Sequence, residues 1–404
     1  MKILIGADTY APDVNGASYF AQRLATALAG RHEVHVVCPS TGYASRSTAT
    51  EPGIVEHRVR SLPVLRRRGF RFCAPVRLVA AARRILTEVR PDVVHVQSHF
   101  PLCRALIGAA AGLGIPVVAT NHFMPENLTH YVPVGDLGRR RLHEWAWRDL
   151  AGVYGRAAVV TAPTPYAAAL AERAGVPGPV LPISCGMDLS RFGTGHNSAG
   201  FRLRYGVPAR PTIGYVGRLD KEKNIDVVVR ALARVRRHVD AQLMLVGTGA
   251  ERGRLAALAA DLGVADALVF TGFVADADLP AAYAATDVFV NAGTAELQSL
   301  VTLEAMACGV PVVGADASAL PHLVRPGDNG LLFPPGDDAA LADRLLAILA
   351  DPARAAAMGR RSRILAEEHD EARTIAAFDE IYARVGGQRP TVPAATVPAL
   401  RVSA

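Results

Sequence analysis

Residues 287–314 read DVFVNAGTAELQSLVTLEAMACGVPVVG, and this stretch decides the fold class. Two short runs rich in Val flank the segment SLVTLEAMAC, whose composition is that of a helix. Near-continuous Val, Ile and Leu is typical of strands that are buried on both faces of a parallel sheet. Gly309 follows the segment, at a position where glycine commonly ends a helix. The stretch therefore predicts a strand, a helix and a second strand of the same sheet.

The same alternation of apolar strands and helices continues along most of the chain. Apolar residues recur at helical spacing in segments such as GASYFAQRLATALAG. The strand-like runs are KILIGA, EVHVVCP, DVVHVQS, PVVATN, AVVTAPT, PTIGYVGRL, AQLMLVGTG, ALVFTGF, DVFVNAG, PVVGAD and NGLLFPP. Strands that alternate with helices in this way predict an α/β fold built on parallel sheets.

The alternation pauses between residues 182 and 211, and this segment with Gly and Pro is the best candidate for a linker. It divides the chain into two doubly wound, Rossmann-like domains, residues 1–190 and 191–369. A cleft between the carboxyl ends of the two sheets is the expected place for a ligand. Residues 386–404 are rich in Pro and Ala without a period, and we predict a disordered tail there.

Bulk composition excludes several classes of protein. The chain of 404 residues is half hydrophobic and carries a net charge of +7. No apolar run is long enough for a spanning helix or a signal peptide, so a cytoplasmic protein is expected. The five cysteines are scattered, which indicates reduced thiols. No nucleic-acid-binding motif is present, and the excess charge suits an anionic membrane or a phosphorylated substrate.

Two glutamates, Glu296 and Glu304, flank the start of the helix in the opening stretch. The free backbone N–H groups of Gln298, Ser299 and Leu300 would point out of this helix start, which favours an anion such as phosphate. Glu304 lies among apolar residues and needs hydroxyl donors, such as those of a ribose. The alternative, a glutamate satisfied by a core arginine or a backbone amide, stays open on this stretch alone.

The segment GYVGRLDKEKN places two cations directly after a strand that ends at Val216. Arg218 offers a bidentate fork and Lys223 a compact ammonium, and both could reach a diphosphate and stabilise charge on a leaving group. Lysine is rare in this chain, with three residues in all. The alternative is a solvated basic loop.

Two positions in the first half of the chain also follow strands. Gly16 opens the first helix after the Asn-Gly pair and would let the backbone approach a phosphate, although an ordinary turn needs the same residue. His122 follows the strand PVVATN and could bind a sugar or a reacting hydroxyl, although a lone histidine is more often structural.

Two further segments imitate ligand sites. VGTGAERG does not have the spacing of a phosphate-binding glycine loop, and a tight turn before a helix explains it. The pair Asp276 and Asp278 precedes the helical segment LPAAYAATD, so we expect Asp278 to cap a helix and no metal to bind.

Together these motifs resemble one family. The Glu296–Glu304 spacing followed by EAMACGVPVV, the GRLDKEKN loop, the Asn-Gly pair and the segment GMDLSRF are similar, in order, to retaining glycosyltransferases of family 4 with the GT-B fold. The resemblance covers roughly residues 1–385. The combination of motifs is highly specific, whereas each motif alone is not.

The resemblance implies a hexosyltransferase that moves a glucosyl or mannosyl group from a nucleotide-diphosphate sugar to a hydroxyl acceptor. The anomeric configuration would be retained by attack on the front face, with the leaving phosphate taking the acceptor proton. No cofactor and no metal would be needed. The C-terminal helix, about residues 370–385, would cross back onto the first domain.

The resemblance also implies a role for each matched residue of the catalytic centre. Glu296 would contact the donor hexose at the reacting centre, and His122 would face the hexose. Arg218 and Lys223 would bind the diphosphate, which Gly16 approaches from the other domain.

The other donor contacts would come from the second domain. Backbone amides of Gln298, Ser299 and Leu300 would bind sugar hydroxyls and phosphate. Glu304 would hold the ribose, and Val274 would meet the base through its backbone.

One departure from the family pattern concerns the donor sugar. Many members read Glu-x-Phe-Gly, whereas this chain reads Glu296-Leu297-Gln298-Ser299. Serine removes some backbone freedom, and the Gln298 side chain could contact the sugar. Glutamine at this position occurs in members that build glycolipids.

The acceptor is expected to bind the first domain. The segments LPVLRRRGFRF and GRRRLHEWAWRDL interleave basic and aromatic residues, which suits peripheral contact with an anionic membrane at the inner face of the cell. A glycolipid acceptor is therefore the first hypothesis, and a soluble aminocyclitol or secondary metabolite is the second. A sugar-nucleotide epimerase and a non-catalytic module that binds nucleotide sugars are alternatives from other classes.

Overall fold

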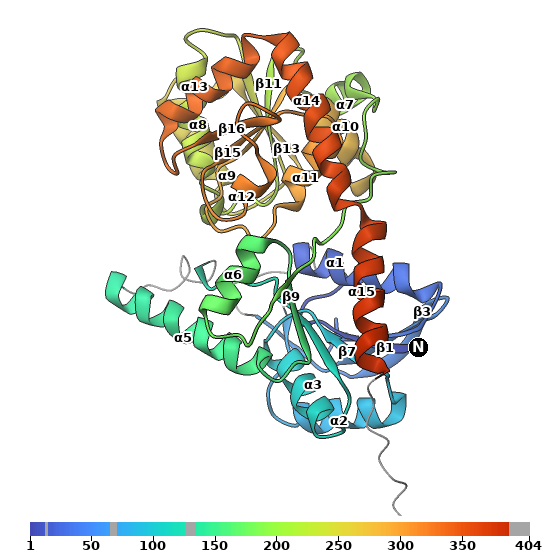
Figure 1. Cartoon of the computed structure of the whole chain (residues 1–404). Helices are drawn as coiled ribbons and strands as arrows, with labels where there is room; N and C mark the ends of the chain where they lie inside the picture. The colour runs from blue at the N-terminus through green and yellow to red at the C-terminus, as the bar shows by residue number, and fades with distance from the viewer. Residues whose placement is uncertain (13–14, 65–70, 127–134, 388–404) are drawn as a thin grey trace, which may run out of the picture.

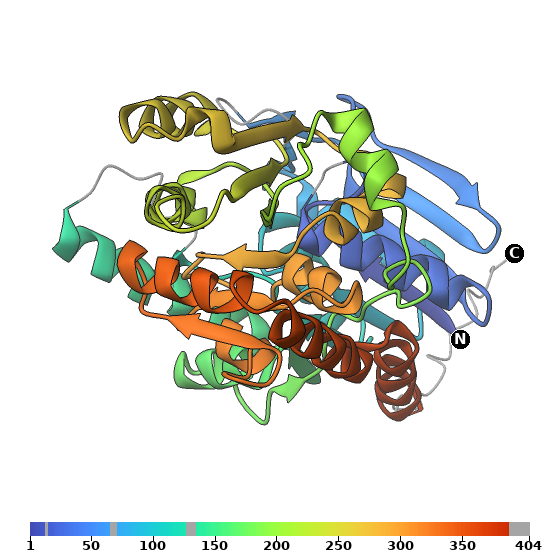
Figure 2. The same cartoon turned by 90° about the horizontal axis from the view of Figure 1, so that it is seen from above.

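Two α/β domains lie one above the other in the computed structural model, which describes residues 1–12, 15–64, 71–126 and 135–387 (Figure 1). Seen from above, the two domains overlie each other (Figure 2). The α/β fold with two doubly wound domains is confirmed, because each sheet is built almost entirely from parallel strands.

The sheet of the first domain has eight strands in the order β10-β9-β8-β7-β1-β2-β4-β3. Neighbouring strands are parallel except β3, which runs antiparallel to β4. The strands are β1 (Lys2–Gly6), β2 (Glu33–Pro39), β3 (Arg46–Glu51), β4 (Ile54–Val59), β7 (Val93–Val96), β8 (Val117–Thr120), β9 (Val159–Ala162) and β10 (Leu181–Pro182). A separate hairpin pairs β5 (Leu62–Pro63) with β6 (Arg71–Phe72).

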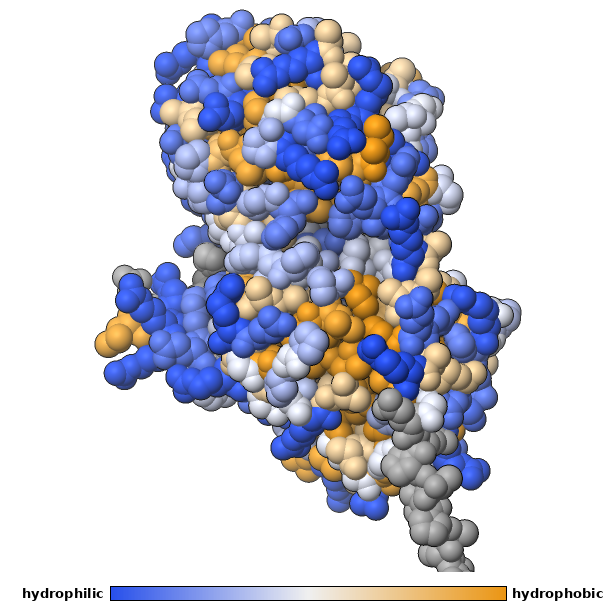
Figure 3. All heavy atoms as spheres, viewed as in Figure 1, coloured by the Kyte–Doolittle hydropathy of each residue, from blue (hydrophilic) through white to orange (hydrophobic). Residues whose placement is uncertain are grey.

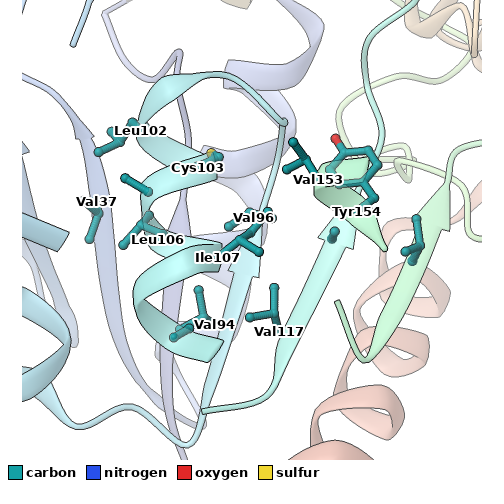
Figure 4. Close-up of a cluster of buried hydrophobic side chains, with 14 of the residues drawn as sticks. Val37, Val94, Val96, Leu102, Cys103, Leu106, Ile107, Val117, Val153 and Tyr154 are labelled. Carbon is teal, nitrogen blue, oxygen red and sulfur yellow. The ribbon is translucent and has the colours of Figure 1, made fainter. Parts of the chain in front are cut away.

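Helices cover both faces of this sheet, and the core of the first domain lies between the helices and the sheet. Figure 4 shows one face, where Leu102, Leu106 and Ile107 of α3 pack against Val94 and Val96 of β7. The helices are α1 (Gly16–Ala29), α2 (Leu78–Val89), α3 (Pro101–Ala111), α5 (Asp136–Tyr154) and α6 (Pro165–Arg173).

The sheet of the second domain has six parallel strands in the order β13-β12-β11-β14-β15-β16. All six correspond to runs predicted from the sequence. The strands are β11 (Thr212–Val216), β12 (Gln242–Val246), β13 (Leu268–Gly272), β14 (Val288–Asn291), β15 (Val312–Ala315) and β16 (Gly330–Phe333).

The helices of the second domain include one inside the segment predicted as a linker. This helix, α7 (Ser198–Tyr205), buries Phe201 in the same core cluster as Phe192, because the segment carries a few large apolar residues among its glycines. The other helices, with 3₁₀ helices labelled η, are η1 (Lys221–Lys223), α8 (Ile225–Val235), α9 (Arg252–Asp261), η2 (Ala265–Ala267), η3 (Asp276–Asp278), α10 (Leu279–Ala284), α11 (Leu300–Ala307), α12 (Leu320–Leu323), α13 (Asp338–Leu349), α14 (Pro352–Ala366) and η4 (Glu367–His369).

The last helix, α15 (Glu371–Gly386), returns from the second domain to the first (Figure 1). Its Phe378 and Tyr382 are fully buried in the core formed by β1, β2 and α1. Tyr382 also hydrogen-bonds the buried His95 of β7 at 2.6 Å. Helix α15 is therefore part of the first domain's core, although the chain enters it from the second domain.

The structure bears on two further predictions, the disordered tail and the absence of a spanning helix. The predicted tail lies outside them from residue 388 onward, and Gly386 is the last residue of α15. Among the described helices, none is both long and apolar enough to cross a membrane.

Candidate active site

Most of the candidate residues follow the strands at which the order of each sheet reverses. In the first sheet the reversal lies between β1 and β7, and in the second it lies between β11 and β14. Ligands of doubly wound sheets bind at such switch points, outside the carboxyl ends of the strands. Gly16 comes after β1, Arg218 and Lys223 come after β11, and Glu296 comes after β14. The topology thus brings these residues to the junction of the two domains.

The N-termini of α1 and α11 meet across this junction. A Cβ atom placed on Gly16 would lie 3.7 Å from Cδ1 of Leu300, the first residue of α11. Asn15 caps α1, since its side chain accepts from Ser18 N at 2.9 Å. Two helix starts that face each other form a region of positive potential suited to a diphosphate.

Glu296 and Lys223 form an ion pair in which Nζ lies 2.8 Å from Oε1. Lys223 ends the short helix η1, and Glu296 lies in the loop between β14 and α11. Both side chains are largely but not fully buried. The structure therefore joins two residues that sequence reasoning singled out separately, 73 positions apart.

Arg218 stands in the same loop as Lys223, with its guanidinium about half exposed. It is bound by Asp220 and by Glu222, whose Oε1 accepts from Nη2 at 2.8 Å. These two carboxylates hold the Arg218 guanidinium in place. The contact of Arg218 with a diphosphate stays a prediction.

The segment VGTGAERG packs closely against this loop. Leu219 N donates to Thr248 O, and Glu251 N donates to Leu219 O, both at 2.9 Å. A Cβ atom on Gly249 would overlap the backbone of Leu219, so the close approach requires glycine. The predicted tight turn before a helix is what the structure shows.

The start of α11 is held by a buried network of hydroxyl and amide groups. Ser299 is the N-cap, and its Oγ accepts from Asn291 Nδ2 at 2.9 Å and from Thr302 N. Within the described part of the chain, the backbone N–H groups of Gln298, Ser299 and Leu300 donate to no protein acceptor. These amides retain the capacity to bind an anion or a sugar oxygen.

Glu304 lies inside α11, and its Oε2 accepts a hydrogen bond of 2.6 Å from the hydroxyl of Tyr283. The partner is a tyrosine of α10, neither a core arginine nor a backbone amide. Burial raises the pKa of Glu304 to about 7, although Tyr283, Arg191 and Arg23 oppose this shift. The carboxyl is thus poised to change its charge near neutral pH.

His122 follows β8 and lies partly buried beside Phe20, with ring centroids 4.9 Å apart. Its Nε2 lies 2.9 Å from Gln97 Oε1, and its Nδ1 lies 3.8 Å from the thiol of Cys185. Burial lowers the pKa of His122 to about 4, so the ring is neutral at physiological pH. Its contact with a hexose stays a prediction, since both nitrogens have protein partners here.

Val274 follows β13, and its side chain is buried in the core of the second domain. Its backbone is therefore the part that a base could reach. Asp278 does not cap α10 with its side chain, contrary to the prediction. The turn η3 keeps Asp278 in a helical conformation, whereas a capping residue is normally extended.

The carboxylate of Asp278 instead accepts from the Tyr205 hydroxyl at 2.8 Å and pairs with Arg204. Asp276 accepts from Tyr19 of the first domain at 3.4 Å. No group of three or more His, Cys, Asp and Glu side chains in the described residues could hold a metal ion.

The Gln298 side chain has protein partners that the sequence did not indicate. Both of its polar atoms bind the chain segment at Ser184 and Cys185, and its contact with a sugar stays a prediction. Sequence reasoning also missed Tyr283 and Thr164, whose hydroxyl donates to Leu297 O at 2.8 Å. No local motif marks these residues, since their partners are more than 20 positions away.

Comparisons with known proteins find matches to both domains. A family model described as Glycosyltransferase Family 4 matches residues 14–191, and one described as Glycosyl transferases group 1 matches residues 210–351. The GDP-mannose-dependent alpha-mannosyltransferase of Mycolicibacterium smegmatis is 31% identical over 368 residues, which are 90% of this chain and 92% of that protein. The alpha-monoglucosyldiacylglycerol synthase of Streptococcus pneumoniae is 28% identical over 82% of this chain and 75% of its own.

A solved structure of HepE from Anabaena in complex with UDP has the same fold. The TM-score is 0.78 at 22% identity, and the match covers 95% of this chain and 100% of that one. The GT-B architecture expected from the motifs is confirmed.

Proposed function

We propose that this chain, which belongs to glycosyltransferase family 4, transfers a mannosyl group from GDP-mannose to a hydroxyl of a lipid acceptor, with retention of the anomeric configuration. The chain is a hexosyltransferase that uses a nucleotide-sugar donor. The choice of GDP-mannose rests on the name of the M. smegmatis relative. The S. pneumoniae relative makes glucosyl transfer to a lipid the alternative.

The observation that carries the proposal is the Lys223–Glu296 pair beside the start of α1 and the amides of residues 298–300, which donate to no protein acceptor in the described chain. We assign the diphosphate to Lys223, Arg218 and the two helix starts, because these groups supply positive charge at the junction of the domains. Glu296, bound to Lys223, then lies at the border between diphosphate and hexose. We assign the ribose to Glu304. Tyr283 donates to Oε2 of this carboxylate, and the other oxygen, Oε1, could accept from a ribose hydroxyl.

In the reaction that we propose, the bond between the anomeric carbon and the diphosphate oxygen breaks as the acceptor oxygen bonds to that carbon on the same face. The acceptor proton passes to the departing phosphate oxygen. Lys223, Arg218 and the amides of residues 298–300 stabilise the negative charge that develops on the diphosphate. No metal is needed in this scheme, because the chain's own cations and amides carry that role.

The proposal of a lipid acceptor is supported by α5, which projects from the side of the first domain (Figure 1). Its Leu137 and Trp145 are 67% and 59% exposed, and Arg140, Arg141 and Arg148 are exposed on the same helix. Figure 3 shows this arm as a hydrophilic surface with an apolar patch near its tip. Exposed aromatic and basic residues on one helix suit the surface of an anionic membrane.

The structure describes the other basic segment only in part. Residues 65–70 of LPVLRRRGFRF lie outside the described residues. Arg71 donates to Ser61 Oγ at 2.8 Å and to backbone oxygens, so its charge is used within the protein.

A panel of donors and acceptors tests the proposal. Purified protein is incubated with UDP-, GDP- and ADP-linked glucose and mannose, with diacylglycerol or phosphatidylinositol in vesicles and with soluble inositol as the matched lipid-free acceptor. We expect mannosyl transfer from GDP-mannose to a lipid, with an α-linked product by NMR. Transfer to inositol alone would refute the lipid acceptor, and an inverted product would refute retention. Release of an epimerised sugar without transfer would support the epimerase instead.

A further inference from the structure

The Gln298 side chain connects the donor loop to the chain segment that leaves the first domain. Its Oε1 accepts from Cys185 N at 2.8 Å, and its Nε2 donates to Ser184 Oγ at 2.9 Å. Residues 184–187 follow β10 and form the first connection between the domains. Gln298 therefore uses both ends of its amide on one short segment more than 110 positions away.

The same segment is bonded to the second connection, which leads from η4 into α15. Ser184 Oγ lies 2.9 Å from His369 Nδ1, and Ser184 O accepts from Thr374 Oγ1 at 3.0 Å. Met187 N donates to His369 O at 2.7 Å, and Glu371 N donates to Met187 O at 3.0 Å. The two connections are thus bonded into one unit, which Gln298 joins at Ser184 and Cys185, and its Nε2 also lies 3.5 Å from His369 Nδ1.

Gln298 also lies within the loop that carries the proposed reacting groups. Glu296 is two residues before it, and Leu297 O accepts from Thr164 of the first domain. The amides of Ser299 and Leu300 follow directly. A shift of the connections would therefore move these groups through Gln298.

We propose that Gln298 is a positioning residue, which sets the place of Glu296 and of the start of α11 relative to the two connections between the domains. This inference rests on the proposed function, since it assigns Glu296 to the reacting centre. Gln298 acts through Ser184 and Cys185, not by touching the sugar. Its effect is on the rate of the chemical step, because misplacement of a reacting group by a fraction of an ångström is costly.

A double-mutant cycle separates this role from a sugar contact. Gln298→Met keeps the length of the side chain but removes both hydrogen bonds, and Ser184→Ala removes the acceptor of the bond from Gln298 Nε2 while Cys185 N keeps its own. We expect each variant to lower kcat by roughly fivefold to tenfold, with the donor KM changed by less than about twofold. The double variant is expected to be no slower than the slower single variant, because both changes break one linkage.

Gln298→Glu is the conservative variant, since its carboxylate can accept both from Cys185 N and from the Ser184 hydroxyl, and most of the rate is expected to return. Ser190→Ala is the control, because exposed Ser190 lies three residues beyond the first connection and its hydroxyl donates to Asp188, not to Gln298. Additive losses in the double variant, or a full rate in Ser184→Ala with an altered donor preference in Gln298→Met, would overturn the proposal. A normal rate in Gln298→Met, in Ser184→Ala and in the double variant would also overturn it.

Hydrogen exchange of the unliganded protein gives a readout that does not depend on activity. The Cys185 amide is expected to exchange up to about tenfold faster in Gln298→Met than in the unsubstituted chain, because it loses its acceptor. Unchanged exchange at Cys185 would refute the linkage itself. If the unsubstituted protein transferred no sugar, the proposed function would fail while this measurement still tested the linkage.

Discussion

At the scale of single residues, the Lys223–Glu296 pair gives the most direct test of the proposed function. Replacing either residue leaves the other partly buried without its partner and removes a group from the reacting centre. We expect Lys223→Ala and Glu296→Ala each to lower the transfer rate by at least about two orders of magnitude. Steady-state kinetics with the best donor of the panel measures this.

Lys221→Ala is the matched control for Lys223→Ala, because Lys221 lies in the same short helix and is exposed. Its rate is expected to stay near that of the unsubstituted chain. A near-normal rate for Lys223→Ala or Glu296→Ala would contradict the role assigned to that residue. An equal loss for Lys221→Ala would indicate a general effect of loop charge.

Glu304 predicts a pH dependence of donor binding. Its pKa is raised by burial to about 7, so the carboxyl is protonated below that pH and ionised above it. A ribose diol donates to the ionised form, and donor affinity should therefore fall roughly tenfold per pH unit as the pH drops below about 7. Calorimetry with GDP-mannose between about pH 6 and pH 8 measures the affinity and the proton released.

Glu304→Gln keeps an acceptor for the Tyr283 hydroxyl but cannot ionise. Its affinity should be lower at about pH 8 and nearly constant across the range. His122 does not contribute to this dependence, because its pKa lies at about 4. If the pH dependence persisted in Glu304→Gln, a group other than Glu304 would be responsible.

Residue types and spacing allowed Glu296, Glu304 and Lys223 to be selected from the sequence, but not their partners. Tyr283 and Thr164 have no motif, and their hydroxyl groups become relevant only after the helices are packed. The direction of the Gln298 side chain depends on Ser184, which belongs to another part of the chain. Such choices are made by tertiary contacts that a local pattern does not contain.

At the scale of elements, helix α5 leads to a prediction about membranes. Trp145 is exposed on a basic helix, and its transfer to the lipid interface should favour binding. We expect Trp145→Ala to weaken binding to anionic vesicles by roughly tenfold at low salt, and binding should also fall as salt rises. Co-sedimentation with vesicles of phosphatidylglycerol measures both effects.

Leu203→Ala is the control, because Leu203 is 88% exposed but lies on α7 of the second domain. Its vesicle binding should equal that of the unsubstituted chain. Absence of binding at low salt would exclude the membrane contact, and equal losses in both variants would show that α5 is not the contact surface.

The elements that the sequence predicted are those with continuous apolar runs, and the missed ones lack such runs. Strand β3 reads RSTATE and is exposed along its whole length, so it has no hydrophobic pattern. Strand β4 reads IVEHRV and lies between β2 and the edge strand β3. Its charged residues interrupt the apolar run by which a strand is predicted. Strand β10 has two residues, too few for a period.

At the scale of the whole molecule, two connections and one helix link the two domains. The connections pair through Met187 and Asp370, and α15 fixes the second connection to the core of the first domain. The motifs indicated two domains and their family, but they did not indicate that the connections are bonded to the donor loop. The arrangement at the junction therefore follows from contacts among three separate segments of the chain.

Gly186 provides the test of this arrangement. Its φ is 73°, and a Cβ atom there would lie 3.0 Å from Glu371 Cα and 3.0 Å from Thr374 Oγ1. Gly186→Ala should push the two connections apart and lower the transfer rate by at least about tenfold, since a small displacement of reacting groups has a large effect. Kinetics and hydrogen exchange at residues 184–187 and 369–371 measure the change.

Gly114→Ala separates this effect from backbone strain, because Gly114 has a φ of 67° but no atom within 4 Å of its added Cβ. Both variants should lose about 1 to 2 kcal/mol of unfolding free energy from the left-handed backbone. Only Gly186→Ala should also lose transfer activity and protection of the connections. Equal behaviour of the two variants would mean that the contact between the connections does not control the position of the active groups.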